Sequence, residues 1–543
     1  MTTHARLVAA LLAASSLALA QQPPPPAQGD YSIRGLVVSA KTGKPLDRAS
    51  VTLSNADTAA RITDTTTGED GSFDFERLQP GGYGLHASRR GYNAASYDEH
   101  EGFFSAIVTG PGLDSADLRM KLLPEAVIGG IVTDDAGEPV RGALINLYRK
   151  YSFDGSGRIT QARGEQTDDV GAFEFTRLGP GDYFVSVNAT PWYATRPQPK
   201  LDVQGNPLPD TQSTSSLDVA YPITFYPDAT DSDDATPIPV RAGDHVQLNF
   251  SLHSVPAVHL YLKLPGSREP NHQIFIPQIT QNIFGQPFPV PSMNSFFNPG
   301  SAEVVGIPPG HYEIRFPGAN GQLGAESSLD LTADATIESQ SADPGVEIRG
   351  KVAMITGDAP PPSLTIILGF SSASFNRGEP TAKDGTFTMK GVPAGTYDVE
   401  VGGSYSIVRM VADGASTEDH QLKVGSTPVN LVLMLAQESA TIDGYAKQNG
   451  KAMEGAMVVL VPHDPGENRE LFRRDQSNSD GSFSLKNVAP GAYTLIAIED
   501  GWSLDWARPE VISRYTAHGL KIEVALSQKS IKISEPIEAQ PRQ

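Results

Sequence analysis

Short stretches in which apolar and polar residues alternate recur along the chain from about residue 30 onward. Alternation with a period of two places successive side chains on opposite faces of a β-strand. It is clear at Ala49–Leu53, Phe73–Phe75 and Phe173–Phe175, and further alternating runs occupy residues 117–123, 246–252, 430–436 and 520–526. No convincing amphipathic helix follows the N-terminal leader. About seven short strands per hundred residues, separated by turns, predict an all-β fold of the sandwich type.

One short pattern occurs five times and divides the chain. A turn containing Gly leads into a short strand, and a second Gly follows the first at a spacing of ten residues. A Tyr comes two residues after the second Gly in each copy, at Tyr83, Tyr183, Tyr312, Tyr397 and Tyr493. Gly accepts the positive φ that a tight hairpin needs, and a Tyr that starts a strand after a turn is typical of a tyrosine corner. Both are interpreted as structural, and their repetition predicts a row of similar domains.

The repeat interval places five domains in the chain. The first Gly of each copy stands at Gly71, Gly171, Gly300, Gly385 and Gly481, at intervals of 85 to 129 residues. Each interval suits one hydrophobic core of about one hundred residues. We predict a tandem array of about five β-sandwiches at 31–124, 125–254, 255–343, 344–437 and 438–530, followed by a disordered tail at 531–543. The third, at 255–343, is divergent and keeps only the final turn and Tyr.

The N-terminus has the pattern of a secretory signal peptide, predicted at residues 1–20. Arg6 precedes an apolar stretch from Leu7 to Leu19, and an Ala-x-Ala cleavage site stands before Gln21. The stretch is shorter than the roughly 20 residues that a membrane span needs, and no later apolar run reaches that length. Residues 21–30 are a Pro-rich linker, which favours an extended spacer. We therefore expect an exported protein, periplasmic, secreted or at the cell surface, with no integral membrane span after cleavage.

Composition narrows the class of partner. The chain contains no Cys, which together with the leader favours a bacterial envelope or extracellular protein whose domains are stable without disulfides. It has 42 Lys and Arg against 63 Asp and Glu, a net charge of −21. Nucleic acids and anionic membranes require a basic face, so both are disfavoured as partners.

The motifs resemble a known family. Residues Gly130–Ala143 read G-x-V-x-D-x-x-G-x-P-V-x-G-A, and Asp168–Tyr183 contain D-x-x-G-x-F-x-F followed by L-x-P-G-x-Y. This combination resembles the carboxypeptidase regulatory-like domain, whose relatives include transthyretin-like, carbohydrate-binding-like and Cna-B-type folds. The resemblance is strong in the first, second and fifth copies, fair in the fourth and weak in the third. It implies a transthyretin-like (prealbumin-like) sandwich for each copy and, because the family is an accessory domain of metallocarboxypeptidases, no peptidase activity.

No catalytic motif accompanies the repeats. None of the 11 His residues has a Glu three positions later, so the ligand pair of a zinc carboxypeptidase is missing from the sequence. A serine-hydrolase elbow, a thiol nucleophile and a phosphate-binding glycine loop are missing as well. We predict that the chain is not an enzyme and requires neither a cofactor nor a metal. The acidic run Asp228–Asp234 could hold Ca²⁺, but it lacks a regular Asp-x-Asp-x-Asp-Gly loop, and a solvated loop is the better interpretation.

The Trp residues are the best candidates for a binding site. All three lie in segments that follow a Tyr strand, and loops on a rigid sandwich commonly carry binding residues. Sugar rings stack on aromatic faces while Asp and Arg side chains bond their hydroxyl groups. The candidate carbohydrate-binding residues are Trp502, Asp505, Trp506, Arg508, Trp192 and Tyr193. The alternative interpretation is that these aromatic residues cover a sandwich edge or pack between domains.

The function predicted from the sequence is that of an exported, non-catalytic bacterial module that binds and spaces, with glycan as the favoured ligand. Its partner would be a polysaccharide or a cell-envelope protein. The alternative is a purely structural or protein-binding rod without a small ligand, and an enzyme with an unrecognised site is the remote alternative. Residues 265–300, rich in Pro, Asn, Gln and Phe, break the pattern and could form an exposed hairpin or a partner-binding insertion.

Overall fold

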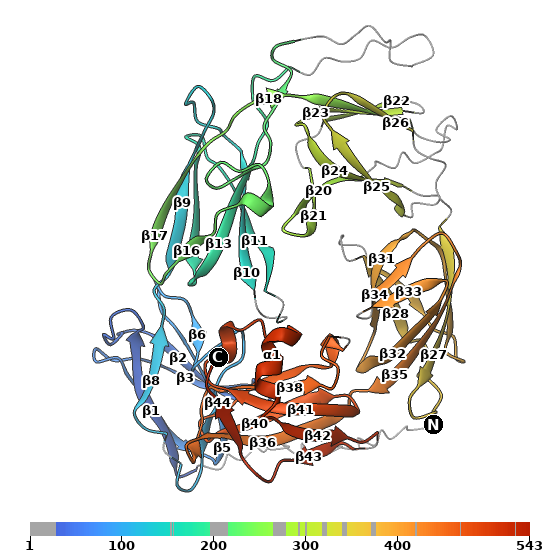
Figure 1. Ribbon diagram of the computed structural model, residues 1–543. Coiled ribbons are helices and arrows are strands. Elements are labelled where there is room, and N and C mark those ends of the chain that lie inside the picture. The colour runs from blue at the N-terminus through green and yellow to red at the C-terminus, as the bar shows by residue number, and fades with distance from the viewer. Residues whose placement is uncertain are drawn as a thin grey trace, which may run out of the picture.

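The computed structural model describes residues 29–543 except 114, 152–154, 156, 196–214, 264–277, 291–293, 299–300, 318–322, 339–344, 371–375, 419–420, 467 and 527. The predicted signal peptide and most of the Pro-rich linker lie outside the described residues, as does Gly300. The described chain forms five β-sandwiches in sequence, which confirms the predicted tandem all-β architecture (Figure 1).

The first sandwich shows the plan that the others repeat. One sheet has a central first strand, β1 (Tyr31–Ser39), paired antiparallel with β4 (Ser72–Leu78) and parallel with β8 (Leu118–Leu122). The facing sheet consists of β2 (Ser50–Asn55), β3 (Arg61–Thr66), β5 (Gly81–Ser88), β6 (Ala95–Ser96) and β7 (Ile107–Thr109).

The second and third sandwiches keep this plan. In the second, β9 (Ala126–Thr133) lies between β12 (Ala172–Leu178) and β17 (His245–Ser251), facing β10 (Leu144–Tyr151), β11 (Arg158–Gln166), β13 (Gly181–Asn188), β15 (Thr224–Phe225) and β16 (Ile238–Val240). The short 3₁₀ helix η1 (Ser232–Asp234) follows β15, and β14 (Val219–Ala220) pairs with β18 (Val255–Pro256). In the third, β19 (Val258–Lys263) lies between β23 (Ser301–Ile307) and β26 (Ala335–Glu338), with β22 (Asn294–Asn298) beside β23, facing β20 (Gln278–Ile283), β21 (Gln286–Pro289), β24 (Gly310–Pro317) and β25 (Leu323–Leu331).

The fourth and fifth sandwiches add strands at the edges. In the fourth, β27 (Val346–Met354) lies between β30 (Thr386–Val392) and β35 (Val429–Gln437), with β32 (Tyr405–Asp413) beside β35, facing β28 (Thr365–Phe370), β29 (Asn376–Pro380), β31 (Gly395–Val401), β33 (Ala415–Glu418) and β34 (Gln421–Val424). In the fifth, β36 (Ala440–Gln448) lies between β40 (Ser482–Val488) and β43 (Ser530–Lys532), with β37 (Lys451–Ala452), facing β38 (Met457–Pro462), β39 (Arg473–Gln476), β41 (Gly491–Ile498) and β42 (Leu520–Val524). Its short helices are η3 (Arg469–Leu471), η4 (Gly501–Ser503) and α1 (Pro509–Thr516).

Alternation along the strands decides which face is buried. Phe73 and Phe75 of β4 are each only 4% exposed, whereas Asp74 between them faces solvent and pairs with Arg34 at 2.9 Å. Each sandwich contains one main cluster of such inward residues. Burial of this apolar surface, at about 25 cal/mol per Å², is the main force holding each sandwich together, since the chain has no disulfide.

The repeated motif has the same geometry in every described copy. Gly71, Gly171, Gly385 and Gly481 have φ between 74° and 80°, the left-handed conformation predicted for the hairpin turn. The strand that follows ends in a bulge, where the pairing register shifts and one residue takes a positive φ: Arg77, Arg177, Gly306, Gly391 and Asn487. The divergent third sandwich therefore shares the bulge with the others.

The predicted tyrosine corner is present in all five sandwiches. Each Tyr hydroxyl donates a hydrogen bond to the backbone carbonyl four residues earlier, at 2.7 to 2.9 Å. All five rings are at most 8% exposed, so they belong to the cores and the structural interpretation is confirmed. The bond ties the turn before the strand to the strand itself.

Two expectations about the C-terminal part of the chain were wrong. Helix α1 (Pro509–Thr516) exists, but only Ile512 and Tyr515 are buried on it, which is too few positions for a helical period to stand out. The tail expected to be disordered instead forms β43 and β44 (Ile537–Gln540). Alternate residues Ile537 and Ala539 enter the core, and β44 pairs with both β36 and β41. No described helix is long and apolar enough to cross a membrane.

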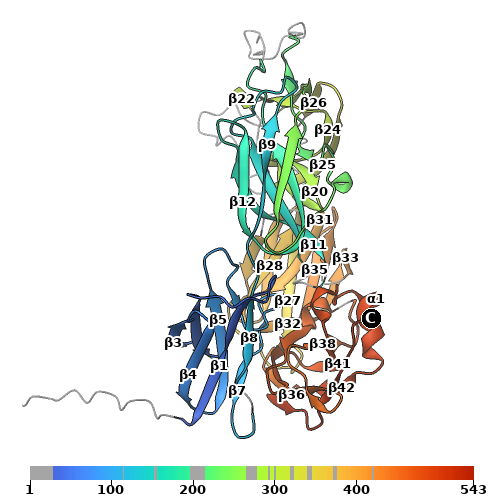
Figure 2. The same cartoon turned by 90° about the vertical axis from the view of Figure 1, so that its left-hand side faces the viewer.

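The five sandwiches are arranged in a closed ring rather than a rod. Figure 1 shows the first sandwich beside the fifth, and the quarter turn of Figure 2 shows the same two side by side. Hydrogen bonds confirm the contact, for example from Ser105 Oγ to the carbonyl of Ser477 at 3.0 Å. The contact joins segments that are 372 residues apart in the sequence.

Candidate functional site: the contact between the first and fifth sandwiches

The structure places Trp502 and Trp506 inside the molecule. Trp502 belongs to η4 and Trp506 follows it, and each is 7% exposed. They lie where residues 97–108 of the first sandwich meet residues 454–455, 474–479 and 502–506 of the fifth, a contact that we call the closing joint. These two rings therefore do not offer an open face on which a sugar could stack.

Aromatic rings and one cation form the centre of the closing joint. Trp502 stacks on His100 with ring centroids 5.3 Å apart and an interplanar angle of 10°, and its ring lies 5.5 Å from that of Phe103. The guanidinium carbon of Arg474 lies 4.2 Å from the centroid of Trp506 and 5.1 Å from that of Phe103. A cation enclosed by aromatic faces is attracted to each of them, and the attraction grows as water is excluded.

Polar bonds fix the register of the closing joint. The Arg474 side chain, only 4% exposed, pairs with Glu101 at 2.9 Å. The backbone N–H of Ala106 donates to Asn478 Oδ1 at 2.9 Å, and the N–H of Ser479 donates to the Ala106 carbonyl at 3.0 Å. Val108 N–H donates to Ser479 Oγ at 2.9 Å. Because hydrogen bonds are directional, this set permits one alignment of the two sandwiches.

Two carboxyl groups from the two sandwiches meet at the edge of the closing joint. Burial raises the pKa of Asp98, and the nearby charge of Asp500 raises it further, whereas His100, Lys121 and a hydrogen bond from Ser105 lower it. Burial also raises the pKa of Glu454, and the negative charge of Asp98 adds to that effect. Ionising either carboxyl group is therefore unfavourable in the closed state, so the stability of the closing joint depends on pH.

Asp505 and Arg508 are engaged with protein groups as well. Asp505 lies 3.8 Å from Lys150 Nζ of the second sandwich and 3.7 Å from Arg508 Nε. The neighbouring Ala507 N–H donates to the carbonyl of Gly155 at 3.3 Å. The loop after η4 thus contacts the β10–β11 hairpin in addition to the first sandwich. The alternative interpretation, packing between domains, describes where Trp502, Trp506 and Asp505 lie, whereas Arg508 lies beside Asp505 in the same loop.

Trp192 and Tyr193 form a separate pair on the second sandwich. Trp192 is 79% exposed, and its ring lies 5.8 Å from that of Tyr193 at an angle of 87°. Within the described residues, no ring contact joins this pair to Trp502 or Trp506. Of the six predicted site residues, the structure thus places Trp502, Trp506 and Asp505 at contacts between sandwiches and Arg508 beside Asp505 of its own loop, whereas Trp192 is exposed and Tyr193 is half-buried.

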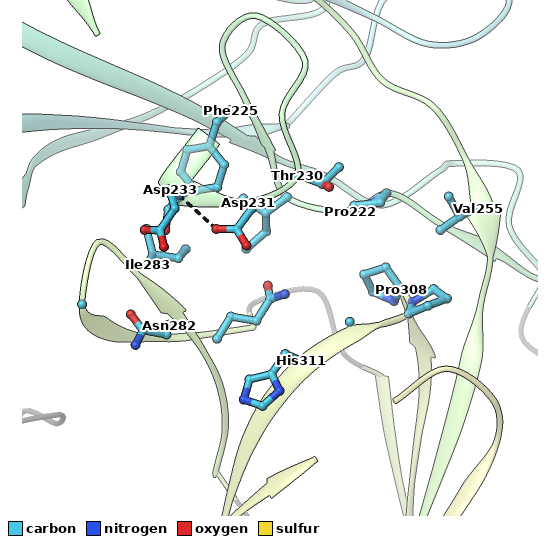
Figure 3. Close-up of a pocket in the computed structure, with 16 residues that line it drawn as sticks. Pro222, Phe225, Thr230, Asp231, Asp233, Val255, Asn282, Ile283, Pro308 and His311 are labelled. Carbon is cyan, nitrogen blue, oxygen red and sulfur yellow. Dashed lines mark hydrogen bonds between the residues drawn. The ribbon is translucent and has the colours of Figure 1, made fainter. Parts of the chain in front are cut away.

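Sequence reasoning missed a second interdomain region. Tyr148, Ile223 and Phe225 of the second sandwich pack with Ile283 of the third, and Phe284 packs against them, a contact that we call the 2–3 joint. Its rings lie close: Phe284 is 5.2 Å from Tyr148 and 5.6 Å from Phe225. A cavity of about 770 Å³ opens beside it, with Asp231, Asp233 and Asn282 among its walls (Figure 3). The acidic run 228–234 and the Asn- and Gln-rich stretch are both visible in the sequence. Neither pattern indicates which residues it will face in the fold.

A buried histidine lies where the same two sandwiches join. His259 Nε2 lies 2.8 Å from Asp218 Oδ2, and Nδ1 lies 3.6 Å from Glu303 Oε1. Glu303 and then Asp218 raise the pKa of His259, and burial opposes them. Within the described part of the chain, no group of three or more His, Asp and Glu residues is placed to hold a metal ion.

The family comparison identifies the first of the five sandwiches. Residues 32–106 match the carboxypeptidase regulatory-like domain. This segment is a carboxypeptidase regulatory-like domain. The regulatory-like domain supplies Asp98, His100, Glu101, Phe103 and Ser105 to the closing joint. The resemblance stated from the motifs is confirmed there, and the shared strand plan, bulge and tyrosine corner extend the same fold to the other four sandwiches.

Comparisons over longer stretches are distant. A streptococcal ancillary pilin is 11% identical, with 53% of this chain and 100% of that chain covered and a TM-score of 0.20. The TIE protein of Bacillus anthracis is 9% identical over 94% of this chain and 75% of that one, with a TM-score of 0.17. GBS52, a minor pilin of Streptococcus agalactiae, is 15% identical, with 42% of this chain and 97% of that chain covered and a TM-score of 0.21. No curated protein sequence matches the chain.

Proposed function

We propose that the protein is an exported, non-catalytic module that binds and spaces, and that it works as a closed array of five sandwiches. The observation that carries the proposal is the closing joint. It brings the two ends of the array together through a buried Arg474, two Trp rings and a set of directional backbone bonds. Aromatic residues and Arg are the side chains that dominate stable protein contacts, particularly when they are desolvated as here.

Closure distinguishes this proposal from the predicted rod. In an open row, each sandwich can turn relative to its neighbours, and flexibility accumulates along the chain. In a ring, the closing joint removes that freedom, so the loops of different sandwiches are held at fixed separations. A module of this kind presents several surfaces in one geometry, which serves spacing and multivalent contact.

Site-specific crosslinking tests the closed array. The chain has no native Cys, so a maleimide reagent reacts only with the introduced thiols. Asp57 of the first sandwich and Lys486 of the fifth are exposed and line one cleft of about 850 Å³ between the two sandwiches. The variant Asp57→Cys/Lys486→Cys should form an intramolecular crosslink with a flexible bismaleimide at high dilution, seen as a linked peptide by mass spectrometry.

The matched control moves one thiol across the ring. Asp57→Cys with Lys390→Cys, in β30 of the fourth sandwich, should form no intramolecular crosslink because the fourth sandwich lies on the other side of the ring (Figure 1). Absence of the first crosslink in the folded protein, or equal yields from both pairs, would mean that the array is open in solution.

Glycan binding remains a second candidate function because of one observation. Trp192 exposes 79% of its surface beside the Tyr193 ring, and an exposed aromatic pair is a suitable platform for a sugar face. If this pair holds the sugar, Trp192→Ala should abolish or strongly weaken binding to a glycan array without changing the melting temperature, because the ring contributes little to the core. Unchanged binding by this variant would remove the pair from consideration.

A further inference from the structure

Two sequence segments without an assigned role face each other across one cavity. The acidic run 228–234 supplies Asp231 and Asp233 from the second sandwich, and the Asn- and Gln-rich stretch supplies Gln281 and Asn282 from the third. The cavity measures about 770 Å³. Figure 3 shows the two carboxylates on one wall and Asn282 on the opposite wall. A cavity lined by convergent polar groups at a domain boundary is a common form of ligand site.

The cavity is formed by parts of the fold that are already fixed. Its walls include Ile223, Phe225 and Ile283, which are 6%, 2% and 4% exposed and belong to the 2–3 joint. The backbone N–H of Phe284 donates to Ser232 Oγ at 3.1 Å and fastens the β20–β21 hairpin to the second sandwich. A ligand would not have to bring the two walls together, which reduces the entropic cost of binding.

Local structure orients the two carboxylates. Asp231 caps η1, where its Oδ1 accepts a hydrogen bond from the Asp233 N–H at 2.9 Å, drawn as the dashed line in Figure 3. This cap fixes the backbone of the acidic run, so that Asp231 and Asp233 line the cavity while Asp234 does not. The run is thus a folded wall rather than only a solvated loop.

Several polar groups in the cavity are uncommitted. The side chains of Asp233, Gln281 and Asn282 make no hydrogen bond to another residue in the described part of the chain. His311 also lines the cavity, but both of its ring nitrogens have protein partners. Its Nδ1 lies 2.6 Å from Asp330 Oδ1, and its Nε2 lies 3.1 Å from Ser328 Oγ. Carboxylates accept hydrogen bonds only, whereas side-chain amides both donate and accept them.

The chemistry of the walls selects a class of ligand. No Lys or Arg is among the lining residues, so the two carboxylates disfavour an anion. A bare cation would bind only to the carboxylate and amide oxygens and would leave the amide N–H groups without a hydrogen-bond partner. A polyhydroxy compound uses both, because each hydroxyl donates to a carboxylate and accepts from an amide. Pro222, Val255 and Pro308 give the cavity an apolar side for the C–H faces of such a ligand (Figure 3).

We propose that the cavity between the second and third sandwiches binds a neutral saccharide, with Asp231, Asp233, Gln281 and Asn282 as its hydrogen-bonding groups. The proposal rests on glycan binding, the second candidate function given above, and it places binding at a site separate from Trp192 and Tyr193.

Calorimetric titration of the full chain tests the site. The probes are short neutral gluco-, manno- and galacto-oligosaccharides, with an oligogalacturonate as the anionic comparison and CaCl₂ alone as a cation comparison. One neutral oligosaccharide should bind saturably in the presence of EDTA. Asp233→Asn and Asn282→Ala should each weaken that binding by about tenfold or more, the cost of losing a hydrogen bond that involves a charged or desolvated group.

Matched variants separate the site from general effects. Asp234→Asn removes the same charge from the adjacent residue outside the cavity, and Gln286→Ala alters the same hairpin away from it, so both should bind like the wild type. Loss of binding in Trp192→Ala together with wild-type binding in Asp233→Asn would overturn the cavity site but keep glycan as the ligand class. No binding by any neutral oligosaccharide to the folded chain would overturn both. Saturable binding of Ca²⁺ alone that Asp233→Asn abolishes, without saccharide binding, would show a cation site and overturn the proposal.

Discussion

The closing joint and the 2–3 joint connect sandwiches by different means. The closing joint links segments 372 residues apart and uses a buried ion pair, cation–π contacts and directional backbone bonds. The 2–3 joint links sandwiches that are consecutive in the chain and uses mainly aromatic packing, together with a hydrogen bond from Phe284 to Ser232. The buried His259, beside Asp218 and Glu303, lies where the same two sandwiches join. Consecutive sandwiches are already held near each other, so apolar contact suffices. Segments joined only through space need groups that define one alignment, since apolar burial alone is not directional.

The largest effect is expected from Arg474→Ala. The Arg474 side chain is 4% exposed, pairs with the partly exposed Glu101 and lies over three aromatic rings, so its removal takes the cation from the aromatic cluster and leaves an empty space. Cation–π contacts of a desolvated guanidinium are worth about 2 kcal/mol or more, and the lost packing of the side chain adds to that cost. We expect the Asp57→Cys/Lys486→Cys crosslink to be lost while each sandwich stays folded by circular dichroism.

Arg349→Ala is the matched control for that variant. Arg349 pairs with Glu347 at 2.7 Å, but its side chain is 71% exposed, and exposed pairs contribute about 0–1 kcal/mol. Introduced into the Asp57→Cys/Lys486→Cys variant, Arg349→Ala should leave the crosslinking yield unchanged. If Arg474→Ala behaved in the same way, the closing joint would not depend on its central cation.

A smaller effect is expected when the aromatic centre of the 2–3 joint is removed. Phe284→Ala deletes ring contacts to Tyr148, Phe184 and Phe225, at a cost of about 2–4 kcal/mol. Amide hydrogen exchange should speed up in the β20–β21 hairpin and remain slow at Ala106 and Ser479. Val170→Ala, at a position 56% exposed, should change neither region. Equal acceleration at both joints would show that they open as one unit.

The closing joint and the His259 contact between the second and third sandwiches should weaken with rising pH in different ranges. Asp98 and Glu454 have a pKa raised from the ordinary 3.8 and 4.5, so the joined state holds protons more tightly than the open state. The closing joint is then strongest below these ordinary values and loses stability as the pH rises through the raised ones. The pKa of His259 is raised from 6.5, so its stabilising charge is complete below pH 6.5 and is lost only as the pH rises through the raised value.

Hydrogen exchange measured across this pH range checks the order of weakening. Protection near Ala106 and Ser479 should start to fall at lower pH than protection near His259. Glu454→Gln should reduce the pH dependence of the closing joint and leave that of His259 unchanged. Simultaneous loss of protection at both places would contradict the assignment of separate titrating groups.

The smallest expected effects concern the repeated tyrosine corner. A Tyr→Phe change removes one hydroxyl-to-carbonyl bond of 2.7 to 2.9 Å and leaves the ring in place, at a cost of about 1 kcal/mol. Tyr312→Phe should lower the midpoint of the third sandwich in urea unfolding, and Tyr83→Phe should do the same for the first. Neither should alter the crosslink across the closing joint.

Sequence reasoning succeeded where local chemistry decides the structure. Gly71 and its equivalents adopt the positive φ that their turn requires, and Tyr183 bonds a carbonyl only four residues away. These relations lie within one repeat, so the repeat itself displays them. Alternation predicted inward residues such as Phe73 and Phe75 for the same reason.

Sequence reasoning could not show which surfaces meet. The position of Trp502 and Trp506 on a loop favours a sugar platform, with packing between domains as the alternative. In the structure Trp506 lies under Arg474 of β39, and Trp502 packs against Phe103 of the first sandwich. No residue near Trp502 in the sequence indicates that His100 stacks on it. The acidic run likewise gains its role as a cavity wall only through residues of the next sandwich. Long-range contacts of this kind depend on the whole arrangement, which no local pattern contains.

Small-angle X-ray scattering of the intact chain tests closure most directly. The account predicts that the wild type scatters as a closed ring, with a scattering curve that the structure reproduces and a maximum dimension that increases in Arg474→Ala. A wild-type curve that fits five sandwiches in an extended row, unchanged by Arg474→Ala, would contradict the closed array.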